Sequence, residues 1–386
     1  MSRIYLDNAA TTPLSPTVIE AMTEVMRTNF GNPSSIHDEG RRARVLIENA
    51  RKTVAEAIGA SIGEIFFTSG GTESNNTALR QSVRCLGVRR IITSPTEHHA
   101  VLHVLDALCK GGEVEQILLD VDERGRISYS QLEDVLQASS VPTLVSLMHA
   151  NNEIGTMIDL DRVAEICAET KAYFHSDTVQ TLGYFPIDVS RTQISFMNGA
   201  AHKFYGPKGV GFLYINGENI IDPLLLGGAQ ERNMRAGTEN LYGIVGMAAA
   251  LREATEQMAE RRAHISRLRS YLMQGILEQI PGAQILGDYD GQYHYKTLAV
   301  RFPASPVADI LQLKLDIAGI SVSGGSACSS GADAGSHVFE AISKNATDKM
   351  IRFSFSHHNT MEELDTTLRT LRTALGVTAP VRQEVS

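Results

Sequence analysis

The sequence predicts an α/β protein with a largely parallel sheet covered by helices on both faces, joined to a smaller α+β domain. Short apolar runs alternate with amphipathic segments between about residues 45 and 215, a pattern typical of buried parallel strands connected by helices. Polar motifs follow these runs directly, where the carboxyl ends of parallel strands hold ligands. The length of 386 residues suits two domains that share one site.

Six apolar runs are expected to form the strands of the main sheet. They are residues 65–68, 91–94, 115–119, 144–148, 173–176 and 210–215. A single long helix is expected over residues 238–279, because Ile265, Leu268, Leu272 and Ile276 share one face and Pro281-Gly282 stops the pattern.

The last hundred residues are expected to form the compact α+β layer. Its segments are 296–302, 307–318, 320–323, 350–355 and 361–374. We predict a large domain at 15–260 and a small domain at 261–386, with residues 1–14 returning to pack beside the small one.

Composition narrows the class of protein and its partners. The chain is 43% hydrophobic and 20% charged, as ordinary globular proteins are, and no apolar stretch approaches the roughly 18 residues that cross a bilayer. A net charge of -9, a pI near 5.8 and the lack of a basic run argue against direct nucleic-acid binding. The start MSRIYLDNAATT lacks the features of a secretory signal. We therefore expect a cytoplasmic protein without a membrane partner.

The cysteines support a reducing compartment. Cys85, Cys109, Cys167 and Cys328 lie far apart with no C-x-x-C pair, which disfavours a disulfide framework or a zinc site. The first three are expected to be small buried side chains on helices. We assign no metal site, because the adjacent histidines of TEHHAV (96–101) lack carboxylate ligands in a matching pattern.

Residues 177–211 hold the groups that a pyridoxal phosphate site needs. The cofactor requires a lysine to hold its aldehyde as a Schiff base and a carboxylate to keep its pyridine nitrogen protonated. Lys203 and Asp177 suit these two tasks.

Three other motifs follow predicted strands, and each has an ordinary structural alternative. Gly71 and Thr72 in FFTSGGTESNN (66–76) offer backbone N–H groups and a hydroxyl to a phosphate, or simply start a helix. His98 in TEHHAV could stack on a pyridine ring, or cap a helix. HANNEIG (149–155) offers two amides, or forms a turn.

Ten motifs in order resemble one family. They are YLDNAATTP (5–13), GNPSSIH (31–37), FTSGGTESNN (67–76), TEHHAV, HANNEIG, SDTVQ (176–180), HKFYGPKGVG (202–211), RNMRAGTEN (232–240), SGGSACSSG (323–331) and IRFSF (351–355). Together they closely resemble the NifS/IscS-type cysteine desulfurases, which are class V members of the aminotransferase-like pyridoxal phosphate superfamily. The resemblance spans nearly the whole chain and implies the PLP-transferase (aspartate aminotransferase-like) fold.

The resemblance also implies roles for individual residues. Lys203 would bind the cofactor and then move protons, Asp177 would pair with the ring nitrogen, Gln180 with the phenolic oxygen, and His98 would stack on the ring. Thr72 and His202 would bind the phosphate beside Gly71.

Two further motifs imply a second subunit and a substrate. Thr238 in RAGT matches a family threonine that reaches the phosphate of the neighbouring subunit, which implies a homodimer with shared sites. Arg352 in IRFS, with Asn152, would hold the substrate carboxylate, a task that suits a guanidinium fork.

Cys328 decides which reaction the resemblance implies. It lies in a Gly/Ser-rich stretch, residues 323–337, for which we expect a mobile, exposed loop. Its thiolate would take the sulfur of L-cysteine as a persulfide, release L-alanine, and pass the sulfur to an acceptor such as an iron-sulfur scaffold.

Three positions depart from the family pattern. Ala200 stands where a hydroxyl residue commonly bonds the phosphate, so that contact is lost or replaced by a neighbour such as Asn198. The common E-P-S-H is AGSH at 334–337, and the usual L-G-R after IRFS is replaced by FSH at 355–357.

Two alternatives to a desulfurase remain: a selenocysteine lyase or another class V enzyme such as an aminotransferase, and a non-catalytic scaffold that retains the fold.

Overall fold

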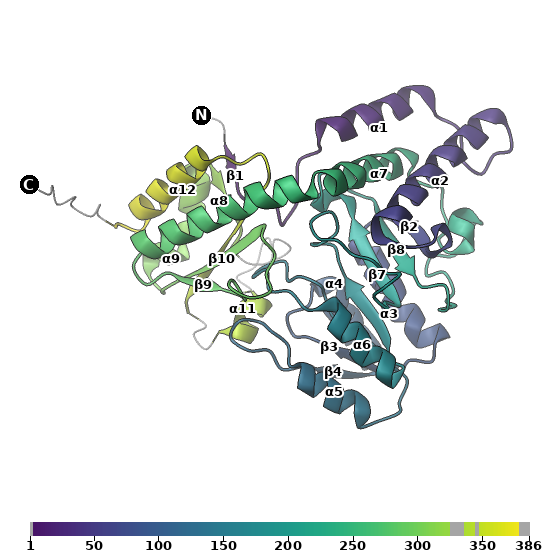
Figure 1. Ribbon diagram of the computed structural model, residues 1–386, viewed down its shortest axis with the longest axis horizontal. Coiled ribbons are helices and arrows are strands. Elements are labelled where there is room, and N and C mark those ends of the chain that lie inside the picture. The colour runs from purple at the N-terminus through teal and green to yellow at the C-terminus, as the bar shows by residue number, and fades with distance from the viewer. Residues whose placement is uncertain (1–2, 325–335, 344–346, 378–386) are drawn as a thin grey trace, which may run out of the picture.

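The computed structural model describes residues 3–324, 336–343 and 347–377, and its centre is a seven-stranded sheet (Figure 1). The strands lie in the order β2-β8-β7-β6-β5-β3-β4. They are β2 Ile65–Thr68, β3 Arg90–Thr93, β4 Glu115–Leu118, β5 Thr143–Ser146, β6 Tyr173–Asp177, β7 Phe196–Ala200 and β8 Gly211–Ile215. Within this sheet β8 alone runs against its neighbours, so the predicted α/β class with a mainly parallel sheet is confirmed.

The sequence pattern did not predict β7. All five of its residues are buried, but Asn198 and Gly199 are poor strand formers and interrupt the apolar run. Pairing with β6 on one side and β8 on the other imposes the extended conformation. The strand matters because the short 3-10 turn Ala201–Lys203 continues directly from it.

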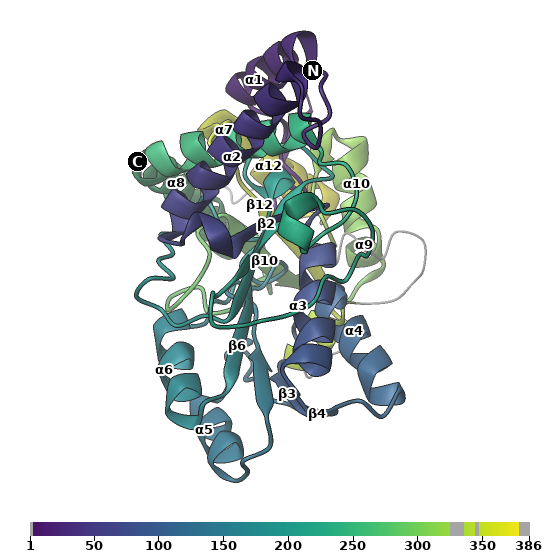
Figure 2. The same cartoon turned by 90° about the vertical axis from the view of Figure 1, so that its right-hand side faces the viewer.

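Helices cover both faces of the sheet (Figure 2). One face carries α3 Gly71–Cys85 and α4 His99–Lys110, and the other carries α5 Tyr129–Gln137 and α6 Leu160–Thr170. Near one end of the sheet, α1 Pro16–Thr28 and α2 Asp38–Ile58 pack against α7 Leu241–Glu256. No helix in the described ranges is long and apolar enough to cross a membrane.

The expected helix over residues 238–279 is two helices, α7 Leu241–Glu256 and α8 Met258–Gln279. The first begins three residues late because the Asn240 side chain accepts a hydrogen bond from the Gly243 N–H at 3.1 Å and caps it. The break falls at Gln257, which ends α7, starts α8 and leaves helical geometry at φ -101° and ψ 7°. In Figure 1 the pair runs end to end from the large sheet to the small one.

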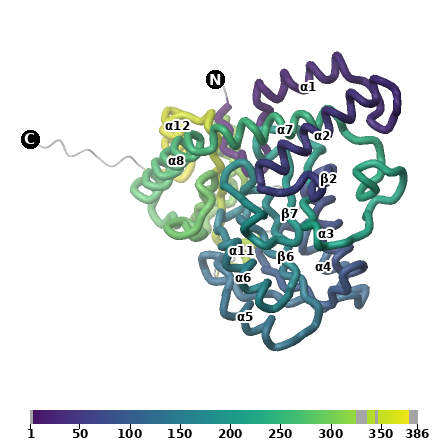
Figure 3. The backbone as a smooth tube through the Cα atoms, turned by 45° about the vertical axis from the view of Figure 1, so that its right-hand side comes forward, coloured from purple at the N-terminus to yellow at the C-terminus, as the bar shows by residue number. Residues whose placement is uncertain are grey.

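The small layer is built from the carboxyl-terminal third of the chain. β10 Thr297–Phe302 lies between β9 Gln284–Leu286 and β12 Lys349–Ser354, antiparallel to both. Its helices are α9 Pro306–Asp309, α10 Leu311–Ile317, α11 His337–Ile342 and α12 Met361–Ala374. The chain start does return here, because β1 Ile4–Tyr5 pairs in parallel with β11 Ile320–Ser321 (Figure 3). The domain limits at 15, 260 and 261 stay a prediction.

Gly211 allows three backbone segments to meet at the start of β8. A Cβ there would lie 2.4 Å from the Gly199 carbonyl oxygen and 2.8 Å from the Gly70 Cα, and main-chain atoms yield poorly. We expect Gly211→Ala to lower the free energy of unfolding by about 1–3 kcal/mol in urea denaturation. Gly63→Ala is the matched control, since its Cβ would meet nothing within 4 Å, and it should change stability by less than about 0.5 kcal/mol. Equal stability of the two variants would contradict this interpretation of the packing.

Candidate active site

The carboxyl ends of the parallel strands bring most of the predicted residues to one edge of the sheet. β2 is parallel to β7 because both run against β8, so the turn after β2 opens on the same edge as the segments after β3, β5, β6 and β7. Residues separated by more than a hundred positions therefore meet there. They are Gly71, Thr72, His98, Asn152, Asp177, Gln180, His202 and Lys203.

Lys203 is held between the chain start and the segment after β6. Its Nζ donates to the carbonyl oxygens of Ala9 and Ala10, both at 2.8 Å. Its own carbonyl accepts from the Tyr184 hydroxyl at 2.9 Å. The amine is thus placed by main-chain oxygens, which no sequence motif identifies.

Asp177 ends β6 with its carboxylate oriented by two N–H donors. Asn75 Nδ2 donates to Oδ2 at 2.7 Å, and the Val179 N–H donates to Oδ1 at 3.0 Å. Asn198 fixes Asn75 in turn by donating to its Oδ1 at 2.6 Å. Asn75 and Asn198 are supporting residues that we did not assign to Asp177 from the sequence, although both stand in or beside the motifs.

The two polar atoms of the Gln180 side-chain amide differ in their hydrogen bonding. Its Nε2 donates at 3.0 Å to the Ala9 carbonyl that Lys203 also uses, whereas its buried Oε1 has no partner in the described part of the chain. A buried amide oxygen without a partner is costly, so a ligand group that donates to it would be stabilised.

The two candidate histidines are neutral. His98 caps α4, because its Nδ1 accepts from the Ala100 N–H at 3.0 Å. Burial lowers the pKa of His98, which favours the neutral ring. Since Nδ1 is the acceptor, the neutral ring carries its proton on Nε2. His202 lies 3.2 Å from the Thr11 hydroxyl through Nδ1, and burial, with Lys203 and Lys208 adding to it, lowers its pKa to about 3. A neutral imidazole can stack on an aromatic ring or donate to an anion.

The turn before α3 has the features of an anion site. Gly70 adopts φ 149°, the helix begins at Gly71, and among the described side chains none caps its first N–H groups. Thr72 is exposed beside them, and a Cβ on Gly71 would come within 2.7 Å of the Val179 side chain. The turn therefore both starts the helix and leaves its positive end open.

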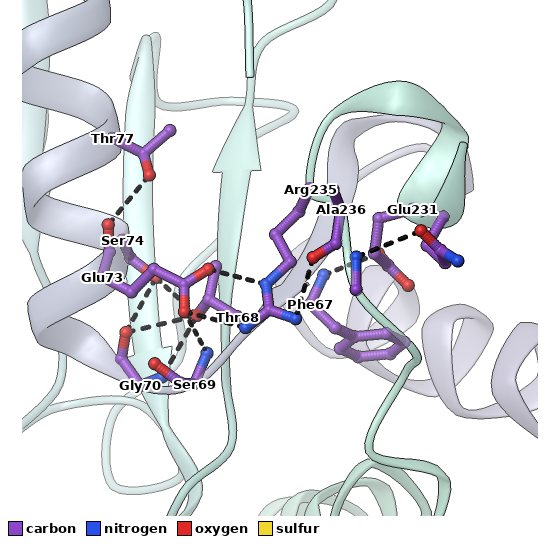
Figure 4. A network of polar contacts seen from close by, with 12 residues as sticks. Phe67, Thr68, Ser69, Gly70, Glu73, Ser74, Thr77, Glu231, Arg235 and Ala236 are labelled. Atoms are coloured by element: carbon purple, nitrogen blue, oxygen red, sulfur yellow. Dashed lines mark hydrogen bonds and ion pairs between the residues drawn. The ribbon is translucent and has the colours of Figure 1, made fainter. Parts of the chain in front are cut away.

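An ion pair ties this turn to the segment that carries Thr238 (Figure 4). Arg235 forks onto Glu73, with Nε 2.9 Å from Oε1 and Nη2 3.2 Å from Oε2, while the Ser69 N–H donates to Glu73 Oε2 at 2.9 Å. Thr238 itself is exposed. Among the described residues, no hydrogen bond joins its hydroxyl to the rest of this site.

The same segment is strained just before Arg235. Glu231, Arg232 and Asn233 have φ values of 44°, 57° and 67°, which side chains larger than glycine rarely adopt in succession. A buried bidentate ion pair stabilises this backbone conformation, because Arg51 donates to both carboxylate oxygens of Glu231 at 2.7 and 2.9 Å. This ion pair holds the backbone at Glu231, seven residues before Thr238.

Arg352 is buried and already has two partners. Its Nη2 lies 2.7 Å from Asp7 Oδ1, and its Nη1 donates at 2.8 Å to the main-chain carbonyl of Asn152. Asn152 thus orients the arginine, while its predicted contact with a substrate stays a prediction. Asp7 stands inside the YLDNAATTP motif but had no assigned role, and a substrate carboxylate at Arg352 has to share the guanidinium with it.

Cys328 lies outside the described residues, as do 334 and 335 of the AGSH departure. The residues that follow contact the segments after β5 and β3: Ser336 caps α11 and donates to the buried Glu153, and His337 Nε2 lies 2.8 Å from the Glu97 carbonyl. Ala200 is buried. Asn198 does not supply the phosphate contact that a hydroxyl at position 200 would make, because its side chain already bonds to Asn75, Gly71 and the Thr178 N–H.

Two expectations about thiols and metals can be compared with the structure. Cys85, Cys109 and Cys167 lie on helices as expected, but only Cys167 is buried, while Cys85 and Cys109, at the ends of α3 and α4, are half-buried. Within the described ranges, no group of three or more His, Cys, Asp or Glu side chains is arranged to hold a metal ion.

The residues at this edge fit pyridoxal phosphate. The Lys203 amine suits the aldehyde, the oriented Asp177 carboxylate the ring nitrogen, and the His98 imidazole the ring face. The Gln180 amide oxygen and the start of α3, which have no side-chain partner among the described residues, suit the phenolic oxygen and the phosphate.

Comparisons with known proteins point to one family. Residues 4–367 match the family model of class-V aminotransferases. The chain is 41% identical over 372 residues to the putative cysteine desulfurase IscS 1 of Bacillus subtilis, covering 95% of this chain and 97% of that protein. It is 42% identical over 389 residues to cysteine desulfurase IscS of Dictyoglomus turgidum, covering 99% and 97%. A solved NifS-like protein superposes with a TM-score of 0.89 at 37% identity, over 97% of this chain and 99% of that one.

His202 should make the cofactor-free chain less stable in acid. Its pKa is about 3 when folded and about 6.5 when unfolded, so below pH 6.5 the unfolded chain binds a proton that the folded chain does not. Its contribution is complete above pH 6.5 and falls by up to about 1.4 kcal/mol per pH unit on acidification. We expect His202→Gln to lose less stability than the parent between pH 7 and pH 5 in urea denaturation. Parallel losses would show that His202 does not titrate as inferred.

Proposed function

The chain belongs to the class-V aminotransferase family, and we propose that it is a pyridoxal-phosphate-dependent cysteine desulfurase that converts L-cysteine to L-alanine. The observation that carries this proposal is the convergence of Lys203 and Asp177 at the carboxyl edge of the sheet. Relatives named cysteine desulfurase, about two-fifths identical over nearly the full chain, supply the reaction.

The residues at the sheet edge would hold the cofactor. Lys203 binds its aldehyde carbon, Asp177 keeps a proton on its ring nitrogen, and Gln180 bonds its phenolic oxygen. His98 covers one ring face, and Gly71, Thr72 and His202 receive the phosphate. When bound, the cofactor supplies an electron sink that stabilises negative charge at the Cα of an amino acid.

Arg352 and Lys203 would act on the substrate itself. The Arg352 guanidinium, oriented by Asp7 and by the Asn152 carbonyl, binds the substrate carboxylate. The Lys203 amine removes the proton from Cα and returns protons later, and the nearby main-chain oxygens of Ala9 and Ala10 accept from this amine when it is protonated.

Cys328 would carry the sulfur step. Its thiolate attacks the sulfur of the substrate, so an S–S bond forms while the Cβ–S bond breaks, and protonation of the remaining carbon skeleton gives alanine. L-Cysteine and the Cys328 thiol thereby become L-alanine and a persulfide. No outside oxidant is needed, because the substrate carbon is reduced as the two sulfurs are oxidised.

The partners and location belong to the same proposal. The exposed Thr238 on a preset segment supports a homodimer in which it reaches the neighbouring subunit's phosphate. The persulfide would pass to an acceptor protein such as an iron-sulfur scaffold. Free thiols at Cys85, Cys109 and Cys167 are in keeping with the reducing cytoplasm.

Lys203 should be required for covalent cofactor binding. We expect the purified protein to show an absorbance band between about 390 and 420 nm, as lysine-bound pyridoxal phosphate does. Lys203→Ala should lose the band while keeping its thermal stability, and Lys110→Ala, a change at an exposed lysine, should keep it. A chain that never shows the band would instead favour the non-catalytic scaffold.

The Cys328→Ala variant should distinguish a cysteine desulfurase from enzymes with the other class V activities. Cys328→Ala should abolish both persulfide formation, measured by mass spectrometry, and alanine release from L-cysteine, while the cofactor band persists. Cys85→Ala on α3 is the control and should retain both. Undiminished turnover by Cys328→Ala, above all with selenocysteine, would favour a selenocysteine lyase or an aminotransferase.

A further inference from the structure

Asp7 covers the arginine that the proposed reaction uses for the substrate carboxylate. The Arg352 side chain is 1% exposed, whereas the Asp7 side chain is 20% exposed. Arg352 Nη2 donates to Asp7 Oδ1 at 2.7 Å, and Nη1 donates to the Asn152 carbonyl at 2.8 Å. A carboxylate that arrives from solution therefore meets Asp7 before it meets the guanidinium.

The other contacts of the guanidinium are fixed. Arg352 Nε is buried and has no hydrogen-bond partner in the part of the chain that the structure describes. Nη1 donates to the Asn152 carbonyl, which belongs to a tight turn, because the Asn151 side chain accepts from the N–H groups of Glu153 and Ile154 at 2.8 and 2.9 Å. Nη2 is thus the nitrogen whose acceptor is a side chain that can rotate away.

The main chain on both sides of this ion pair is held in place. The Asn8 N–H donates to the Ser354 carbonyl at 3.3 Å, and the Ala9 N–H donates to the Ser354 hydroxyl at 2.8 Å. Ser354 follows Arg352 by two residues on β12. Release of Arg352 by Asp7 therefore needs only a rotation about the side-chain bonds of Asp7, and it leaves the main chain of this segment where it is.

A buried guanidinium needs an anion when no substrate is bound. Removal of one member of a buried ion pair leaves an uncompensated charge, which is strongly unfavourable. Among the described residues, Arg352 alone donates to the Asp7 carboxylate, so this carboxylate is free to leave without breaking another hydrogen bond. A substrate carboxylate that replaces it restores the same kind of charge-assisted hydrogen bond and the same local charge.

We propose that Asp7 is a positioning residue whose carboxylate occupies Arg352 Nη2 until the carboxylate of the substrate replaces it, while the Asn152 carbonyl stays on Nη1. The inference rests on the proposed role of Arg352 in substrate binding. Each substrate molecule must displace Asp7, so Asp7 lowers the affinity for carboxylate ligands while it keeps the arginine in position between turnovers.

The first test measures two ligands of the holoenzyme through the change in the visible band of the cofactor. L-Alanine carries the carboxylate, and L-alaninamide lacks it. In Asp7→Asn the competing charge is gone, and hydrogen bonds to a charged group are about twice as strong as neutral ones, so we expect the dissociation constant of L-alanine to fall about threefold or more. The dissociation constant of L-alaninamide should not fall. Asp134→Asn, at an exposed position on α5, is the control and should match the parent for both ligands.

Unchanged or weaker binding of L-alanine by Asp7→Asn would overturn the inference, because Asp7 would then not compete for Arg352. Equal tightening of both ligands would also overturn it, because the effect would not depend on the carboxylate. A parent without the cofactor band would contradict the proposed function instead, and the inference is then decided by a measurement without cofactor.

The second test uses the cofactor-free chain and acetate as a separate carboxylate. Asp7→Ala leaves Arg352 without its anion, so acetate should take the vacant position. Relative to sodium chloride at the same concentration, we expect sodium acetate to raise the melting temperature of Asp7→Ala by about 1–2 °C more than that of the parent. Addition of Arg352→Gln to Asp7→Ala should remove this difference. An equal effect of acetate on Asp7→Ala and on the parent would reject the exchange of carboxylates at Arg352.

Discussion

The main chain of residues 6–12 joins the two parts of the molecule and carries the candidate site. At one end it pairs with the small layer, through the Leu6 N–H to the Ser321 carbonyl and the Ser354 N–H to the Leu6 carbonyl. At the other end the Thr12 N–H donates to the His202 carbonyl at 2.9 Å. Between them, the Ala9 carbonyl accepts from both Lys203 and Gln180. Because Asp7 also binds Arg352, a shift of this segment would move Lys203 and Arg352 together.

The electrostatic character of the site follows from this arrangement. Lys203 and Arg352 bring positive charge, the open start of α3 adds its dipole, and burial keeps His98 and His202 neutral. Asp177 and Asp7 each face a defined partner, Asn75 and Arg352. The remaining field favours small anions, as the phosphate of the cofactor and the carboxylate of an amino acid are.

The fold and much of the site could be predicted from the sequence. The elements that were predicted wrongly have local causes. In the seven-stranded sheet, the strands other than β7 match their predicted runs to within about two residues, because short apolar runs are strong signals. The short strands β1 and β9 had no predicted run. β7 was not predicted because Asn198 and Gly199 have a low intrinsic preference for strands. Pairing with β6 and β8 overrides this low preference. The break at Gln257 was missed because the apolar spacing continues on both sides of it. The family and its fold, in contrast, rest on ten ordered motifs and agree with the comparisons.

By itself, the sequence determined which chemical groups are present, namely an amine at Lys203, a carboxylate at Asp177, a thiol at Cys328 and a guanidinium at Arg352, and that Asp177 follows a strand. Only the tertiary structure decided what those groups touch. The acceptors of Lys203 are main-chain carbonyls, which every residue has and no motif marks. Asp7 meets Arg352 across 345 positions of sequence, and the Lys296 amine lies 4.0 Å from the centre of the Tyr184 ring across more than a hundred. Contacts between distant segments depend on packing, so they cannot be predicted from local patterns.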